Sequence, residues 1–202
     1  MWFVVGGAVS ISILLSPPAD LIADANLTVH MFQHIGLFAL SIVLGYGLER
    51  YVISKLGTLR KLTYIGWKAF TSVMVANTKT RGVVFVVALP AITFAYWHVP
   101  LNFDLAVQNE SVHVLEHLTY IVSGSLVGLS FQAIKPKWQV SLLYVAFMHA
   151  GIMGSIWSVW TPPYFPLYSS AANIDMDTTL LVFGAIGVVV TSSWMLKVLD
   201  II

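Results

Sequence analysis

Residues 27–53 read LTVHMFQHIGLFALSIVLGYGLERYVI, and no charged residue interrupts this run before Glu49. An apolar segment of this length can cross the hydrocarbon core of a bilayer as a single α-helix. Within it, His30 and His34 stand four residues apart and therefore share one helical face. The stretch predicts a membrane-spanning helix with two polar side chains in its first turns.

The whole chain has the composition of an integral membrane protein. Of its 202 residues, 58% are hydrophobic and 9% are charged, with a mean hydropathy of +0.85, whereas a typical soluble domain has about 25% charged residues. The chain contains no cysteine, which excludes disulfides, iron–sulfur clusters and thiolate metal sites. Its net charge of +1 gives no indication of a nucleic-acid partner. We expect residues 1–202 to form one helical domain in the lipid bilayer.

Apolar runs separated by prolines and polar segments predict an all-α, polytopic bundle of about six transmembrane helices. The predicted helices are about residues 2–15, 27–53, 82–97, 111–134, 138–160 and 179–199. We expect a basic cytoplasmic loop or amphipathic surface helix at residues 54–81 and an outer loop at residues 161–178. The first run could also be read as a signal peptide, but it lacks a basic leader and an Ala-x-Ala site, so we expect a retained span.

The basic residues define the expected orientation. If both termini are inside, all ten lysines and arginines face the cytoplasm, as the positive-inside rule requires. The opposite side then carries six acidic residues, which are Asp20, Asp24, Asp104, Glu110, Asp175 and Asp177. The distribution predicts an N-in/C-in protein and is typical of a prokaryotic plasma membrane.

All six histidines lie in or beside the apolar segments. His113 and His117 repeat the four-residue spacing of His30 and His34. In the expected topology these four and His98 share one outer depth, whereas His149 lies near the midplane. A buried imidazole needs a hydrogen-bond partner or a metal to offset its lost hydration. The sequence predicts one metal site on the extracytoplasmic side, formed by His30, His34, His98, His113, His117 and His149.

Glu116 lies between the two histidines of the second pair. A carboxylate inside a membrane is costly and is by default functional. It could ligate the metal, relay a proton or orient an imidazole from behind the ligands, and we expect the last of these roles. The pattern is not that of a zinc protease, because that signature needs glutamate directly after the first histidine.

The spacing of the histidines bears on what they bind. The axial ligands of a haem approach from opposite faces and normally come from different helices, so a pair on one helix suits a small ion better. Imidazole favours copper, zinc, nickel or iron, and the nearby thioethers of Met31, Met148 and Met153 would suit cuprous copper. Copper is the favoured metal, with zinc and haem b as alternatives.

Three blocks of this sequence resemble those of the CtaG-like cytochrome c oxidase assembly factors. Trp97-His98-Val99-Pro100 resembles that family's Trp-His-x-Pro block. His113-Val114-Leu115-Glu116-His117 resembles its His-x-x-Glu-His block, and His30-Met31-Phe32-Gln33-His34 its His-Met-x-x-His block. Small archaeal membrane proteins of unknown function show similar blocks. The resemblance covers about residues 28–154 and implies an extracytoplasmic-facing site that supplies copper to a respiratory oxidase. This chain is shorter than those family members, which typically have about seven spans.

The sequence therefore predicts a metal-binding membrane protein without a catalytic residue of its own. We expect an assembly factor or accessory subunit of a copper-dependent oxidase or monooxygenase complex, with other membrane subunits as partners. Two alternatives stay open. One is a b-type haem-binding electron-transfer subunit, and the other is a purely structural subunit whose histidines are hydrogen-bonded within the bundle.

Overall fold

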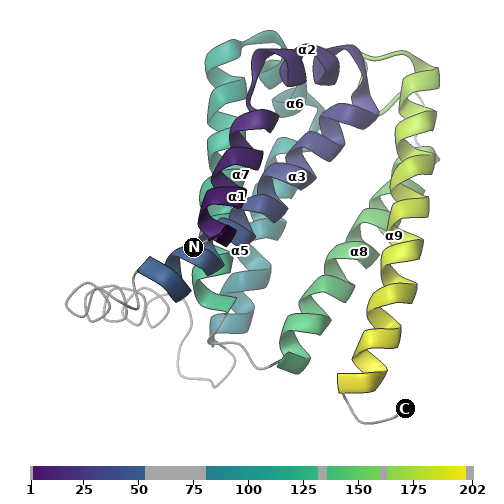
Figure 1. The fold of residues 1–202 in the computed structure, drawn as a ribbon. Coiled ribbons are helices and arrows are strands. Elements are labelled where there is room, and N and C mark those ends of the chain that lie inside the picture. Colours follow the sequence, from purple (N-terminus) through teal and green to yellow (C-terminus); the bar gives the residue numbers. More distant parts are fainter. Residues whose placement is uncertain (1, 53–80, 132–135, 160–162, 199–202) are drawn as a thin grey trace.

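The computed structural model describes residues 2–52, 81–131, 136–159 and 163–198, and every regular element in these ranges is a helix (Figure 1). The long helices are α3 (Leu27–Gly47), α5 (Arg81–Trp97), α7 (Glu110–Phe131), α8 (Pro136–Ser158) and α9 (Ser170–Val198). The shorter ones are α1 (Trp2–Leu14), α2 (Pro17–Ala25), the π-helical turn η1 (Leu48–Val52) and α6 (Pro100–Gln108). The all-helical bundle expected from the sequence is confirmed.

Four of these helices are long and apolar enough to cross a membrane. They are Leu27–Tyr51, Glu110–Phe131, Gln139–Ser158 and Ser170–Val198. A fifth span results if α1 and α2, which meet at a bend of 54°, are counted together, and the apolar part of α5 at Ala88–Trp97 is shorter. The predicted basic loop or surface helix at residues 54–81 lies almost entirely outside the described residues.

Two short helices at one end of the bundle, α2 and α6, were not expected from the sequence (Figure 1). The sequence indicates Pro17 and Pro100 only as points where apolar helices end. In the structure each proline also begins the next helix. Proline is tolerated there because the first N–H groups of a helix have no partner within the helix. The short helices close that end of the bundle and turn the chain back into α3 and α7.

Helix α9 begins at Ser170, well before the predicted start near Thr179, so it takes over the second half of the expected outer loop. The Ser169 hydroxyl accepts a hydrogen bond from the Ala172 N–H and caps the helix. The polar residues of its first turns concealed this start. One of them, Asp177, is buried on the helix rather than exposed in a loop.

Helices α3 and α7 form the centre of the fold and approach each other closely. A Cβ on Gly128 would meet the Ile42 carbonyl oxygen, and a Cβ on Gly45 would meet the backbone of Ser125. Only glycine allows backbones this near to each other, as at many helix contacts in membranes. The contact fixes the rotation of the two helices and thereby aligns the histidines of α3 and α7.

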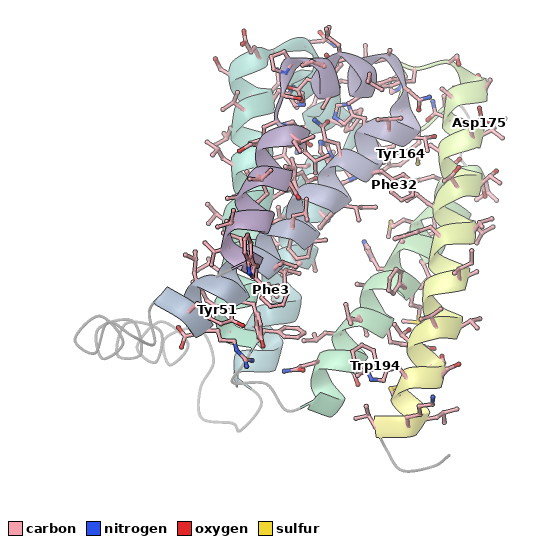
Figure 2. The ribbon with its side chains drawn as sticks, in the orientation of Figure 1. Phe3, Phe32, Tyr51, Tyr164, Asp175 and Trp194 are labelled. Carbon is pink, nitrogen blue, oxygen red and sulfur yellow. The ribbon has the colours of Figure 1, made fainter. Side chains whose placement is uncertain are left out.

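Helices α8 and α9 form a hairpin beside this centre (Figure 1). Phe32 of α3 meets Phe183 of α9 with ring centroids 5.2 Å apart. Figure 2 shows Tyr164 and Asp175 toward the end that carries α2 and α6, and Tyr51 and Trp194 toward the opposite end. The described part of the connection between α8 and α9 therefore lies on the same side as the histidines that begin α3 and α7.

Candidate metal site

The first turns of α3 and α7 carry the site. Asn26 precedes α3, and its side chain accepts a hydrogen bond from the Val29 N–H at 3.1 Å. Asn109 does the same for the Val112 N–H at 3.2 Å before α7. These caps set where each helix begins, so the histidine four residues after each asparagine, His30 or His113, faces the partner helix.

The two helices bring four potential ligands together. One atom each from His30, His34, His113 and Glu116 can be chosen so that all lie within 4.8 Å of one another. We call these four residues the histidine cage. In a tetrahedral site with bonds of about 2.0 Å, ligand atoms lie roughly 3.3 Å apart. Small rotations of the side chains would close the difference, so the donor set fits a single small ion.

Three of the four cage residues are closed to solvent, and His113 is partly buried. His30, His34 and Glu116 have no exposed surface at all, and His117 beside them is 5% exposed. Buried polar groups in proteins normally have hydrogen-bond partners. In the described part of the chain, several atoms of this group have none: Nε2 of His30, His113 and His117, Nδ1 of His34 and Oε2 of Glu116. Each neutral imidazole has a lone pair on one ring nitrogen, and a cation would be bound by such lone pairs together with the carboxylate.

Glu116 is the carboxylate member of the cage and lies beside His34. Its Oε1 lies 3.5 Å from Nε2 of His34. The sequence led us to expect Glu116 behind the ligands, and its carboxylate also lies close enough to the imidazole nitrogens to be a ligand itself. A carboxylate ligand would also offset part of the charge of a divalent ion in this apolar region.

The imidazoles pack tightly against one another. The ring of His30 lies 5.5 Å from that of His113, and the ring of His34 lies 5.5 Å from that of His117. Tyr120 stacks on His34 at 4.7 Å. Rings in such contact leave little room for a macrocycle between the helices. The packing favours a small ion over haem.

Tyr168 belongs to the aromatic outer segment at residues 161–178, which the sequence offered as a cap for the site or a docking surface, and it contacts a cage histidine. Its hydroxyl lies 3.4 Å from Nδ1 of His30. If Nδ1–H donates to this oxygen, the Nε2 lone pair of His30 is free to face the cage. Burial, together with the carboxylates of Asp24, Asp104 and Glu116, raises the pKa of the Tyr168 phenol to about 12. The phenol therefore stays neutral at physiological pH.

Carboxylates lie around this end of the bundle. Asp24 on α2 and Asp104 on α6 are close enough to act on Tyr168 electrostatically. Burial raises the pKa of the Asp104 carboxyl above its ordinary value, and its Oδ1 has no hydrogen-bond partner on the described residues. These acids give the end of the bundle nearest the cage a negative potential when ionised, which attracts cations.

The other three predicted ligands lie outside the cage, and His117 packs beside it with its ring 4.2 Å from that of His113. His98 follows α5 and its ring lies 6.0 Å from that of His34, but its nitrogens contact Phe94, Tyr120 and Met31 instead of the cage. The side chain of His149 is exposed on α8. Among the described residues, no hydrogen bond or ring contact joins His149 to the other histidines.

The two halves of the cage share a pattern that the sequence already contains. Residues 26–34 read NLTVHMFQH and residues 109–117 read NESVHVLEH, so an Asn, a Val and two His recur at identical spacing. In both halves a short helix opens with proline and ends at the Asn, whose N–H bonds to an alanine carbonyl oxygen. The helix pairs α2–α3 and α6–α7 are thus equivalent, and this repeat could have predicted the pairing of His30 with His113.

A family model of proteins of unknown function, DUF1404, matches residues 6–200, which is nearly the whole chain. The chain belongs to the DUF1404 family. No curated protein and no solved structure matches. The DUF1404 description assigns no activity, so the geometry of the cage is the basis for a functional conclusion.

Proposed function

We propose that this DUF1404 protein is a multi-pass membrane protein that binds a metal ion in the histidine cage. The observation that carries the proposal is the convergence of His30, His34, His113 and Glu116, fully or partly buried, with unpartnered nitrogen and oxygen atoms. A purely structural cluster would be expected to satisfy these atoms with hydrogen bonds inside the bundle. A bound cation would be shared by one donor atom from each of the four cage residues.

Copper is the metal that we assign to the cage. A donor set of imidazole nitrogens and a carboxylate binds Cu²⁺ more tightly than the other divalent ions of the first row, zinc included. The chain offers no thiolate that would shift the preference. The likeness of its three histidine blocks to those of CtaG-like assembly factors supports the same metal.

We place the protein in a plasma membrane, with about six spans, both termini in the cytoplasm and the cage facing the extracytoplasmic side. Lys197 near the end of α9 supports this orientation, because basic residues favour the cytoplasmic side. The acidic side chains of Asp24 and Asp104 would then face the outside, where copper arrives.

The protein would store or deliver copper as an assembly factor or accessory subunit of a copper-dependent oxidase or monooxygenase. A catalytic metal site keeps an open position for substrate, whereas a closed site holds its ion. The burial of His34 and Glu116 supports the holding role.

The role can be tested in cells that make the protein naturally. Deletion should lower copper-dependent oxidase activity in the membranes, and added copper should restore it in part. A His34→Ala/His113→Ala chain should fail to complement the deletion, whereas His149→Ala, a change of an exposed histidine on α8, should succeed. Full activity with the double variant would contradict the proposal, and a Soret band in the purified protein would point to haem instead.

A further inference from the structure

His98 and Met31 meet in a contact that the histidine cage does not use. Nε2 of His98 lies 3.2 Å from the Met31 sulfur. Nδ1 of the same ring lies 2.8 Å from the Phe94 carbonyl oxygen and, at a longer 3.5 Å, from the Tyr120 hydroxyl. A carbonyl can only accept, so Nδ1 carries the proton and the neutral ring has a lone pair on Nε2. That lone pair points at a thioether, which is also an acceptor.

Two acceptors at this distance need a positive charge between them or a second proton on the ring. The surroundings oppose the second proton, because Met31 is 2% exposed and belongs to an apolar cluster with Trp157 and Phe165. We infer that His98 and Met31 form a second metal site, separate from the cage, for a soft monovalent cation of the cuprous type.

The chemistry of the two donors selects that class of ion. Thioether sulfur and imidazole are both neutral, and the sulfur prefers soft ions such as Cu⁺. Two neutral ligands leave a single positive charge in an apolar pocket, which costs far less than the charge of a divalent ion. The cage, with its carboxylate, suits the divalent state. The two neighbouring sites would therefore hold copper in different oxidation states.

The His98 ring is already held in the orientation that binding requires. It lies between Phe94, at 5.6 Å, and Trp157, at 5.8 Å and nearly parallel. An ion with bonds of about 2.0 Å to nitrogen and about 2.3 Å to sulfur would part the two atoms by up to about 1 Å. Methionine can supply that movement, because it is unbranched and has three rotatable bonds.

The site breaks the equivalence of the two halves of the protein. The position of Met31 in the NLTVHMFQH segment is occupied by Val114 in NESVHVLEH. Leu15 takes the place of His98 relative to the short helix that follows, since it lies two residues before Pro17 as His98 lies before Pro100. The soft pair therefore exists on one side only, whereas the cage histidines occur in both halves.

The purified full chain can be titrated with Cu⁺ or with Ag⁺ as a redox-inert substitute, under anaerobic reducing conditions. Met31→Leu removes the sulfur and keeps the side-chain volume, so we expect the affinity for one ion to fall at least tenfold. Met176→Leu is the matched control, because Met176 is equally buried in the same apolar cluster. Unchanged binding in Met31→Leu, or an equal loss in both variants, would overturn the assignment.

A second measurement needs no substitution. The chain has no cysteine, so any sulfur beside bound copper comes from one of its seven methionines. X-ray absorption of copper bound to the selenomethionine-labelled protein should reveal a selenium neighbour, and its absence would overturn the inference. The site stands apart from the proposed function. We expect the Met31→Leu protein to bind divalent copper as the unchanged protein does. If the unchanged protein bound Cu⁺ but no divalent copper, that result would contradict only the cage.

Discussion

Nε2 of His34 lies 3.5 Å from Oε1 of Glu116, across the contact between α3 and α7, and both side chains are completely buried. An imidazole and a carboxylate enclosed in this way form a stable arrangement only if a proton or a metal ion lies between them or beside them. The neighbouring nitrogens of His30 and His113 make a metal the better explanation, because one ion can be shared by all four groups.

Replacing Glu116 by glutamine tests its role as a ligand. The amide keeps the shape of the carboxylate but loses its charge, so we expect the affinity for divalent copper to fall by about 100-fold or more. Equilibrium titration of the metal-free protein measures this change. Glu110→Gln at the exposed start of α7 is the control and should bind as the unchanged protein does. Equal affinities for all three proteins would remove Glu116 from the cage.

The Tyr168 hydroxyl is expected to orient His30 through its contact with Nδ1. Tyr168→Phe keeps the ring and removes this oxygen, and we expect roughly tenfold weaker metal binding with little loss of stability. Because the pKa of the phenol is raised to about 12, the difference between the two proteins should not change between pH 6 and pH 9. Tyr96→Phe, at an exposed position on α5, should bind normally.

Asp104 should attract the ion at the expense of the stability of the metal-free protein. Burial raises the pKa of its carboxyl, so the folded chain holds the proton more tightly than the unfolded chain and ionisation destabilises the fold as the pH rises. Asp104→Asn should therefore melt at the same or a higher temperature at neutral pH, yet bind copper somewhat less tightly. The ratio of the two affinities should approach one as the pH is lowered. A variant with a lower melting temperature would contradict this reading.

The close contact of α3 and α7 gives a prediction about stability. A Cβ at position 128 would meet the Ile42 carbonyl oxygen and lie 2.8 Å from the Tyr46 nitrogen, both of which are backbone atoms. Gly128→Ala should therefore destabilise the protein by about 1–3 kcal/mol and weaken metal binding, because the two histidine pairs would move apart. Gly6→Ala is the control, since nothing lies within 4 Å of that Cβ. Thermal unfolding in detergent would compare the two variants.

The helical fold and the main histidines were accessible from the sequence, because long apolar runs and i, i+4 spacing are local features. The two short helices were missed, since a proline that ends one helix can also begin another. The early start of α9 was missed because the first turns of this helix contain polar residues. The Ser169 hydroxyl caps the helix at that point. The sequence drew attention to the Met31 thioether, but its pairing with His98, like that of Tyr168 with His30, depends on contacts between distant segments, which no local pattern specifies.

The repeat of NLTVHMFQH and NESVHVLEH shows how more could have been inferred. Equivalent helices that run in the same direction place equivalent residues opposite each other, as the ring pairs of His30 with His113 and His34 with His117 do. The departure from the repeat at Glu116, where the other half has Gln33, identifies the residue that completes the donor set. Gln33 instead donates to the Leu14 carbonyl oxygen.

The metal content of the gently solubilised protein tests the central claim most directly. It should be measured by mass spectrometry for the unchanged chain, the His34→Ala/His113→Ala variant and the His149→Ala variant. We predict that the unchanged chain and His149→Ala carry the same amount of copper, and that the double variant carries at least one ion fewer per chain while remaining folded. Equal metal in all three proteins, or none in the unchanged chain after copper loading, would contradict the histidine cage.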